Sequence, residues 1–410
     1  MTDWPRAGWP VSIHKAFVFA KVWGSRHGGS IYAQVLVEEL LSAGCKVEVL
    51  SEQFVEHEQI GFGLGLQKTS LAGFFSRNIW RSFTRFADNA GVWSKVMRCR
   101  DSVVIVQGDL PRLTYVLLQI LVPVVLIRQD GILTCPANNR FLARSHKVCR
   151  KTLGLSCLAV HRNEGCFGDL PLIRRVGRIL FRMRDELLLR CIKGFVANSW
   201  YIMRVHRRSE FVLYPPRMPG CGVSMPVRRE FRRLVFCGHL DTPVKGAQDA
   251  IRVLAKLPVP FFLEVLGEGR CRSELEKAAR EMGVENRVRF LGWVDPQERD
   301  AIFASAGLVL MTSLWDEAFG MVGIEAFAQG TPVLAYDVGG IPEWCRPEAG
   351  ILIECGNTEA CAEAILRLMD APQEWAWKSS AAKRITEENF TREHFRWSLW
   401  KILQTVCQPN

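Results

Sequence analysis

Two glutamates separated by seven residues could bind a sugar nucleotide. Glu317 and Glu325 flank Gly320, and strand-like runs at residues 307–311 and 332–336 precede and follow them. A helix that begins after a strand presents backbone N–H groups and the positive end of its dipole, which suits a diphosphate. The two carboxylates can accept hydrogen bonds from sugar hydroxyl groups. The pattern therefore predicts a nucleotide-sugar site.

The spacing of these glutamates resembles the signature of the retaining glycosyltransferases of family 4, also called group 1. Further matches follow in the order of that family, at residues 235–246, 263–269, 288–294 and 338–343. Five motifs in one order are far more specific than a lone glutamate pair. The resemblance is strong over residues 232–370 and weaker but continuous over the first half.

The resemblance implies roles for residues of the second half. Glu317 would contact hydroxyl groups of the transferred sugar, and Glu325 would contact the nucleotide ribose. Lys245 would place a flexible ammonium group on the donor diphosphate. The alternative for all three is an ordinary solvent-exposed side chain beside or on a helix. Residues that would border the donor with backbone groups are Gly320, Met321, Val322, Gly267 and Gly269.

His239 departs from the family pattern, because most relatives have arginine two residues after this strand. Arginine offers a permanent charge and a forked set of donors. Histidine offers one or two donors and a charge that depends on pH. His239 is therefore a candidate catalytic residue that binds the diphosphate as a cation. The alternatives are weaker donor binding, an altered reaction or a purely structural role.

A second departure lies at Gln129 and Asp130, where many relatives have His-Asp. Gln129 cannot take a proton, but it can hydrogen-bond a sugar hydroxyl. The resemblance implies attack on the front face of the sugar, with the leaving diphosphate taking the acceptor proton. Under that mechanism a histidine is not required at this position, and catalysis depends on positioning and on stabilising the departing diphosphate.

The first half begins with a strand over residues 16–22 and a glycine-rich loop. Gly28 and Gly29 would let the loop approach the donor phosphate closely. His27, beside Arg26, is a candidate for acceptor contact, although a structural role is an equal alternative. Ser30 is expected to cap the helix that follows.

The alternation of strands and helices predicts an α/β fold with two doubly wound, Rossmann-like domains. The resemblance implies the GT-B architecture, in which the two domains face a central cleft. We expect an N-terminal acceptor-binding domain over residues 1–215, a nucleotide-sugar-binding domain over 216–388, and a C-terminal helix over 389–410 that returns to the first domain. The apolar run at 113–127 is too short to span a bilayer and is expected to be a helix end followed by a buried strand.

The positive charge is concentrated in the first half. Residues 1–215 contain 30 Lys and Arg against 16 Asp and Glu, whereas the remainder contains 23 against 26. This asymmetry favours an anionic partner. No nucleic acid is expected, because no reader motif is present. Residues 71–100 and 171–193 mix apolar and basic side chains, which suits either an anionic membrane surface or a core-facing helix with a basic outer face.

The first residues lack the apolar core of a signal peptide, so we expect a cytoplasmic protein. This expectation includes a peripheral protein on the inner face of the membrane. The fourteen cysteines would then be reduced. Cys135, Cys149 and Cys157 are spaced too loosely to predict zinc, and no metal or cofactor is expected beyond the nucleoside-diphosphate sugar as co-substrate. The leading hypothesis is a metal-independent transferase in polysaccharide or glycolipid synthesis. The alternatives are a non-catalytic nucleotide-sugar binder and a transferase with a soluble small-molecule acceptor.

Overall fold

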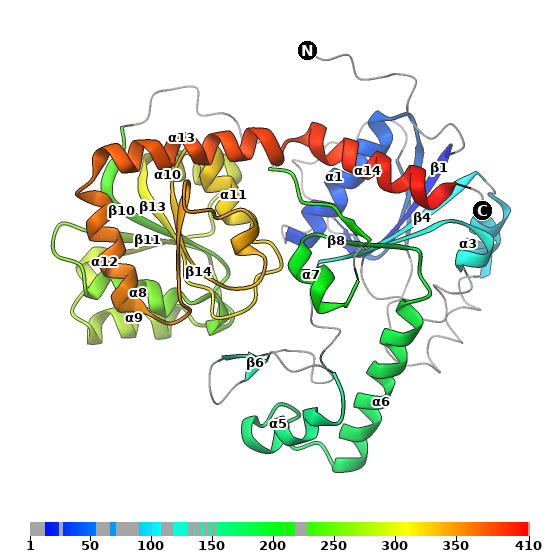
Figure 1. The fold of residues 1–410 in the computed structure, drawn as a ribbon, viewed down its shortest axis with the longest axis horizontal. Helices are drawn as coiled ribbons and strands as arrows, with labels where there is room; N and C mark the ends of the chain where they lie inside the picture. Colours follow the sequence, from blue (N-terminus) through cyan, green and yellow to red (C-terminus); the bar gives the residue numbers. More distant parts are fainter. Residues whose placement is uncertain are drawn as a thin grey trace.

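The computed structural model describes most of the 410 residues of the chain. The described residues are 13–23, 28–54, 66–70, 90–99, 101–107, 118–129, 135, 141–142, 147–149, 153–208, 210–217 and 228–408. They form two lobes that lie side by side, each built around a twisted sheet (Figure 1).

The sheet of the N-terminal lobe has seven strands, all parallel, in the order β3-β2-β1-β4-β5-β8-β9. Both faces of β4 are buried, which is why its sequence is a continuous apolar run. The strands are β1 (Lys15–Trp23), β2 (Lys46–Phe54), β3 (Leu66–Ser70), β4 (Ser102–Gln107), β5 (Val124–Arg128), β8 (Gly194–Ala197) and β9 (Phe211–Val212).

Helices cover both faces of this first sheet. One face packs against α1 (Gly28–Ser42) and α14 (Arg392–Cys407), which contribute residues to the same buried cluster. The other face packs against side chains of α3 (Ala90–Arg98), the end of α6 (Leu172–Leu189) and α7 (Trp200–Val205). The N-terminal lobe is thus a three-layer sandwich completed by the last helix of the chain.

The sheet of the C-terminal lobe has six parallel strands in the order β12-β11-β10-β13-β14-β15. Its first strand, β10, is central, so the chain moves outward first to one side and then to the other. The strands are β10 (Glu230–Cys237), β11 (Phe262–Leu266), β12 (Val288–Gly292), β13 (Ala306–Met311), β14 (Val333–Tyr336) and β15 (Gly350–Ile353). The β10–β13 boundary is the topological switch point, where such sheets bind ligands.

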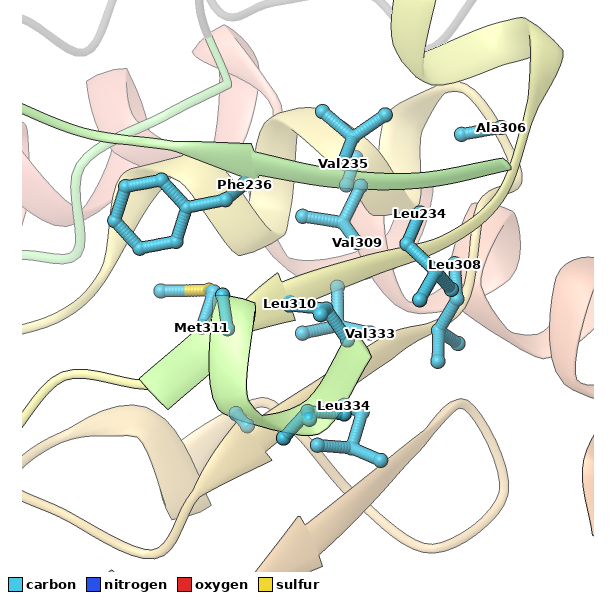
Figure 2. Packing of buried hydrophobic residues seen from close by; sticks show 14 of the residues in the cluster. Leu234, Val235, Phe236, Ala306, Leu308, Val309, Leu310, Met311, Val333 and Leu334 are labelled. Atoms are coloured by element: carbon cyan, nitrogen blue, oxygen red, sulfur yellow. The ribbon is translucent and has the colours of Figure 1, made fainter. Parts of the chain in front are cut away.

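The core of the C-terminal lobe lies on both sides of β10, β13 and β14. Figure 2 shows side chains such as Val235, Leu310 and Leu334 projecting from these strands into it. On one side of the sheet lie α8 (Ala247–Ala255), α9 (Arg272–Glu281) and α12 (Thr358–Met369). On the other side lie α10 (Pro296–Ser305), α11 (Met321–Ala328) and α13 (Pro372–Asn389).

A helical hairpin projects from the N-terminal lobe, away from its sheet (Figure 1). It consists of α5 (Ser156–Glu164) and α6, and a short antiparallel pair, β6 (Phe141–Leu142) and β7 (Lys147–Val148), precedes it. The apolar side chains of α6 include an exposed stripe, whereas Ile179 is buried together with Arg182 and Asp185; the stripe consists of Leu172, Leu180, Met183 and Leu187. The described part of α6 therefore does not bury its apolar stripe as a core helix would.

Three details of the expected elements can be compared with the structure. The helix α1 begins at Gly28, so Ser30 lies inside its first turn and is not the cap that we expected. In the apolar run at 113–127, the described residues from 118 onward form a helix end followed by the buried strand β5, as predicted. Within the described ranges, no helix has both the length and the apolar character needed to cross a membrane.

Candidate active site

Lys245 and Glu317 meet at the switch point of the C-terminal sheet. Lys245 ends a single 3₁₀ turn after β10, and Glu317 lies in the loop after β13. The Lys245 Nζ lies 2.5 Å from Glu317 Oε1, and the Ser313 hydroxyl donates to the same oxygen at 2.6 Å. Two loops that are distant in sequence thus converge on one carboxylate.

Backbone contacts fix these two loops against each other. The Thr312 hydroxyl donates to the Gly246 carbonyl at 2.8 Å, and the Leu314 N–H donates to the Val244 carbonyl at the same distance. Gly246 has φ +75°, and a Cβ there would lie 1.7 Å from the Thr312 carbonyl oxygen. Only glycine fits this position, which places Lys245 directly beside Glu317.

The electrostatics of Glu317 favour its ionised form. Burial acts to raise the pKa of this carboxyl, whose side chain is 13% exposed. The Lys245 ammonium, the hydrogen bonds from Lys245 and Ser313, and the charge of His239 outweigh burial and lower the pKa below its usual value. Glu317 is therefore an acceptor for hydroxyl groups at neutral pH, and exposed His239 contributes to its field.

Helix α11 begins beside this carboxylate. Gly320 precedes it with φ +86°, which turns the chain sharply into the helix. The first N–H groups of an α-helix have no acceptor within the helix, so Met321 and Val322 present donors and the positive dipole end at this point. Lys245 and the start of α11 together make a site suited to a diphosphate.

Glu325 occupies a more enclosed position than Glu317. It lies on the second turn of α11, is 8% exposed, and pairs through Oε2 with Arg299 Nη1 of α10 at 3.1 Å. Burial raises the pKa of its carboxyl, Arg299 acts to lower it, Asp300 acts to raise it, and the net pKa is raised. Any contact of Glu325 with a ribose would have to be made in competition with Arg299.

Gly267 and Gly269 pack against the loop that follows β10. A Cβ at Gly267 would lie 1.9 Å from the Gly238 carbonyl oxygen, and one at Gly269 would lie 2.1 Å from the Leu240 carbonyl carbon. These two glycines are required for close backbone packing. The loop that they support contains His239 and leads to Lys245.

In the N-terminal lobe, the structure brings Gly29 and Gln129 together. A Cβ at Gly29 would lie 3.1 Å from Gln129 Oε1, and the Gln107 side-chain amide donates to the Gly29 carbonyl. Gly28 begins α1 immediately before them. These residues follow the carboxyl ends of β1, β4 and β5. His27 and Asp130, together with Arg26, lie outside the described residues.

The carboxyl edges of the two sheets face each other. Strand β8 leads into α7, and the Tyr201 hydroxyl of α7 donates to the Asp316 carboxylate, next to Glu317. Since all strands of the first sheet are parallel, the ends of β1, β4 and β5 lie on that same edge. Gly29 and Gln129 therefore lie on the edge that is turned toward the C-terminal lobe.

A cavity of about 1250 Å³ opens beside this junction. The segment that carries α5 contributes Val160 and Glu164 to its wall, and the C-terminal lobe contributes Pro243, Leu314 and Asp316. The cavity thus combines walls from both lobes with the loops that hold Lys245 and Glu317. Among the described residues, no group of three His, Cys, Asp or Glu side chains is arranged to hold a metal ion.

Sequence reasoning did not single out several residues of this region. Ser313 and Arg299 were not expected to be partners of the two glutamates, because no spacing rule relates the end of a strand or a neighbouring helix to them. Asp316 adjoins Glu317 and could have been predicted from the sequence as a second carboxylate of the site. Its partner Tyr201 could not have been predicted, since Tyr201 lies in the other lobe.

Comparison with protein-family models gives one match, the glycosyl transferases group 1, over residues 227–388. The D-inositol 3-phosphate glycosyltransferase of Corynebacterium glutamicum (strain R) is 35% identical over 147 residues, 33% of this chain and 35% of that protein. The lipopolysaccharide core biosynthesis glycosyltransferase LpsE of Rhizobium meliloti is 37% identical over 127 residues, 30% of this chain and 36% of that protein. The matched segment therefore spans about a third of the length of each of these two relatives.

Similarity to solved structures extends over both lobes. The crystal structure of Anabaena Alr3699/HepE in complex with UDP-glucose has a TM-score of 0.65 and 17% sequence identity, and the match covers 96% of this chain and 99% of that one. Such low identity establishes the fold alone. Together with the two facing parallel sheets, it shows the GT-B architecture that the resemblance implied.

Proposed function

We propose that this chain, a member of the group 1 glycosyltransferases through its residues 227–388, is a retaining glycosyltransferase. It moves a hexose from a UDP- or GDP-sugar to a sugar-containing acceptor. The observation that supports this most strongly is the Lys245–Glu317 pair at the start of α11, because it combines a cation, helix N–H donors and a carboxylate at one switch point.

In the proposed reaction, the acceptor hydroxyl oxygen attacks the anomeric carbon of the donor from the face that the diphosphate leaves. The bond from that carbon to the diphosphate oxygen breaks, its electron pair stays on the diphosphate, and the diphosphate takes the acceptor proton. Lys245, His239 and the N–H groups of Met321 and Val322 stabilise the departing charge. Glu317 holds the hydroxyl groups of the sugar. We expect turnover to persist in EDTA, because these groups supply the positive charge.

The donor would bind to the C-terminal lobe and the acceptor to the N-terminal lobe. Gly267 and Gly269 would border the nucleotide, and Glu325 would reach the ribose after releasing Arg299. Gly28 and Gly29 would approach the donor phosphate from the N-terminal lobe, and Gln129, Asp130 and His27 would serve the sugar or the acceptor. The cavity between the lobes is lined by neighbours of the two site residues, Pro243 and Asp316, and not by Lys245 or Glu317 themselves.

The acceptor would belong to a cell-surface polysaccharide or a glycolipid. This assignment draws on the names of relatives, which include a lipopolysaccharide core glycosyltransferase and a phosphatidylinositol monomannoside mannosyltransferase. A transferase that acts on a soluble small-molecule acceptor is the alternative. A panel of lipid-linked and free oligosaccharide acceptors would separate the two, since only one class should accelerate release of the nucleotide.

A non-catalytic nucleotide-sugar binder is the second candidate function, and the replacements at His239 and Gln129 favour it. The intact pairing of Glu317 with Lys245 opposes it. The first experiment is a thermal-shift screen with UDP- and GDP-sugars, followed by assay of nucleotide release. Binding without turnover on any acceptor extract would support the binder and refute the transferase.

Glu317→Ala tests the proposed reaction. We expect kcat to fall by about 10²–10³-fold, because a contact to the reacting sugar is lost. The fold and much of the affinity for the nucleotide should remain intact, although the loss of the Lys245 pairing should lower the melting temperature. Glu363→Ala, on the exposed face of α12, is the matched control and should not change kcat. Wild-type turnover in Glu317→Ala would refute the role of this carboxylate.

The hairpin of α5 and α6 is the proposed contact with an anionic membrane surface. The chain would then be a peripheral protein on the cytoplasmic side of the membrane. Exposed apolar side chains on α6 lie among exposed arginines, which suits the interface of a bilayer. The apolar members are Leu172, Ile173, Leu180, Met183 and Leu187, and the arginines include Arg174 and Arg178. Co-sedimentation with vesicles rich in phosphatidylglycerol should fall when Ile173 and Leu180 are replaced by Ser. Unchanged sedimentation would refute the contact. The basic residues at 71–89 lie outside the described ranges.

A further inference from the structure

A turn of the C-terminal lobe joins the Glu317 loop to the other lobe. The turn covers residues 338–343, between β14 and β15, and Glu343 ends it. The Gly340 N–H donates to the Glu317 carbonyl at 2.7 Å. A Cβ at Gly339 would lie 2.0 Å from that carbonyl oxygen, so the backbone of the turn lies directly on the backbone of Glu317.

Three residues further along, the same turn contacts α7 of the N-terminal lobe. Glu343 Oε1 accepts from the Tyr201 N–H at 2.6 Å, and Oε2 accepts from the Trp200 N–H at 2.9 Å. The next N–H of α7, that of Ile202, donates to the Ser199 hydroxyl at 3.2 Å. The N–H groups at the start of α7 are therefore satisfied partly by a carboxylate from the opposite lobe.

Two tyrosines add to this junction. The Tyr214 hydroxyl, in the segment between the lobes, donates to Glu343 Oε2 at 2.9 Å, and the Tyr201 hydroxyl donates to Asp316. Burial and the nearby Glu343 carboxylate hold the pKa of Tyr214 well above its usual value, so this hydroxyl remains a donor at all ordinary pH values. Asp316 and Glu317 are adjacent, so α7 is linked to the Glu317 loop by two routes.

The packing at the turn leaves no room for adjustment. A Cβ at Gly340 would lie 2.4 Å from the Ala318 carbonyl oxygen and 3.3 Å from the Ser199 Cβ. Gly340 is thus enclosed between the Glu317 loop on one side and the start of α7 on the other. A displacement of α7 would act on the Glu317 backbone through this contact.

We propose that Glu343 is a positioning residue for sugar transfer, which fixes the Glu317 carboxylate by holding α7 against the turn that supports it. This inference rests on the proposed transferase function. Separation of the lobes breaks the Glu343 and Asp316 contacts together, so Glu317 reaches its working position only when the lobes are closed. Binding of the nucleotide, which depends on Lys245 and α11, does not require these contacts.

The test compares Glu343→Ala, Glu343→Gln and Tyr214→Phe with the control Glu363→Ala. We expect Glu343→Ala to lower kcat by about 10- to 100-fold, as a misplacement of a catalytic group does. Affinity for UDP or GDP, whichever shifts the melting temperature, should stay within about twofold. Glu343→Gln keeps one acceptor oxygen and should recover part of kcat, and Tyr214→Phe should lose less than Glu343→Ala.

Small-angle scattering supplies a readout that does not depend on activity. Glu343→Ala should have a larger radius of gyration than the wild type and the control, because the lobes part. An unchanged radius, or a kcat within twofold of the wild type, would overturn the proposal. Equal losses of kcat and nucleotide affinity would also overturn it. A wild type that turns over no donor would refute the proposed function instead, while scattering would still test whether Glu343 holds the lobes together.

Discussion

The Lys245–Glu317 pair makes the donor site sensitive to acid. The ammonium lies 2.5 Å from the carboxylate, and the Ser313 hydroxyl satisfies the same oxygen. Because these partners lower the pKa of Glu317 in the folded chain, the unfolded chain binds a proton at a higher pH than the folded chain does. The stabilisation of the folded chain by ionised Glu317 is complete above the ordinary pKa of 4.5. It is lost as the pH falls through the lowered pKa of the folded chain.

We therefore expect Glu317→Gln to lose stability at pH 7 and much less at acid pH. The difference in the free energy of unfolding from the wild type should be about 1.5–3 kcal/mol at pH 7, the range for a hydrogen bond to a charged group. It should shrink as the pH falls from the ordinary pKa of 4.5 through the lowered folded value, below which wild-type Glu317 is itself protonated. Urea denaturation of both proteins across pH 3–7 measures this difference. A difference that stays constant over the range would contradict the lowered pKa.

Substitution of His239 tests how much the affinity for the donor depends on a permanent positive charge at this position. We expect His239→Arg to preserve or increase affinity for the nucleoside diphosphate above neutral pH, because the charge of arginine is permanent whereas that of histidine depends on pH. Isothermal titration with UDP or GDP at neutral and alkaline pH measures this. A large loss of affinity would show that His239 has a different role.

For single residues, the sequence predicted the chemical role of a side chain better than it predicted the residues that the side chain contacts. The resemblance implied that Glu317 and Lys245 border one site, and their side chains do meet, because each follows a parallel strand at neighbouring positions of the sheet. The pairing of Glu325 with Arg299 was not predictable. It depends on how α10 packs beside α11, which no local pattern specifies.

At the scale of elements, the position of α11 depends on a tight contact with a tryptophan. A Cβ at Gly323, in the first turn of α11, would lie 1.9 Å from the fully buried ring of Trp344. The ring cannot shift freely, because its N–H donates to the Phe319 carbonyl at 2.6 Å. Phe319 immediately precedes Gly320, so one contact fixes both the turn into α11 and the helix itself.

Gly323→Ala should therefore destabilise the chain, although alanine is the better helix former. The intrinsic gain is about 1 kcal/mol, whereas overpacking a filled core costs about 1–3 kcal/mol. Because the added Cβ would lie so close to a buried ring, we expect a cost at the upper end of that range. The variant should therefore show a net loss in the free energy of unfolding and weaker nucleotide binding. Gly177→Ala in α6 is the matched control, since no atom lies within 4 Å of its added Cβ, and it should gain about 0.5–1 kcal/mol. A stabilised Gly323→Ala variant would contradict the packing argument.

Strands and helices with strong periodicity were predictable, and short or edge elements were not. β4 is a continuous apolar run because helices cover both of its faces. The predicted tail helix begins one residue after its cap, Thr391, whose hydroxyl accepts from the His394 N–H. By contrast, β15 and β9 were missed, because each is a short edge strand formed by pairing with a neighbour and not by its own pattern.

For the whole molecule, the last helix is part of the first core. Helix α13 lies on the C-terminal lobe, and α14 continues across to the N-terminal lobe (Figure 1). Phe395, Leu399 and Leu403 are buried there, and Arg396 Nε lies 2.5 Å from Glu39 Oε2 of α1. Glu39 is 1% exposed, so Arg396 neutralises a carboxylate that would otherwise be costly to bury.

Because α14 completes the first core, Leu399→Ala should destabilise the N-terminal lobe while leaving the nucleotide-binding lobe intact. Leu399 is fully buried against β-strands and α1, so the cavity left behind should cost about 2–5 kcal/mol. Hydrogen exchange should accelerate in β1, α1 and β4, although these elements lie nearly 300 residues or more before Leu399 in the sequence. Exchange in β10 and β13 should stay unchanged. Gln404→Ala, on the exposed side of α14, should change neither lobe. Faster exchange confined to β10 and β13 would show that α14 stabilises the other lobe instead. The expected pattern would establish that α14 belongs to the core of the N-terminal lobe, although it follows the C-terminal lobe in sequence, and that the nucleotide-binding lobe is stable without this contact.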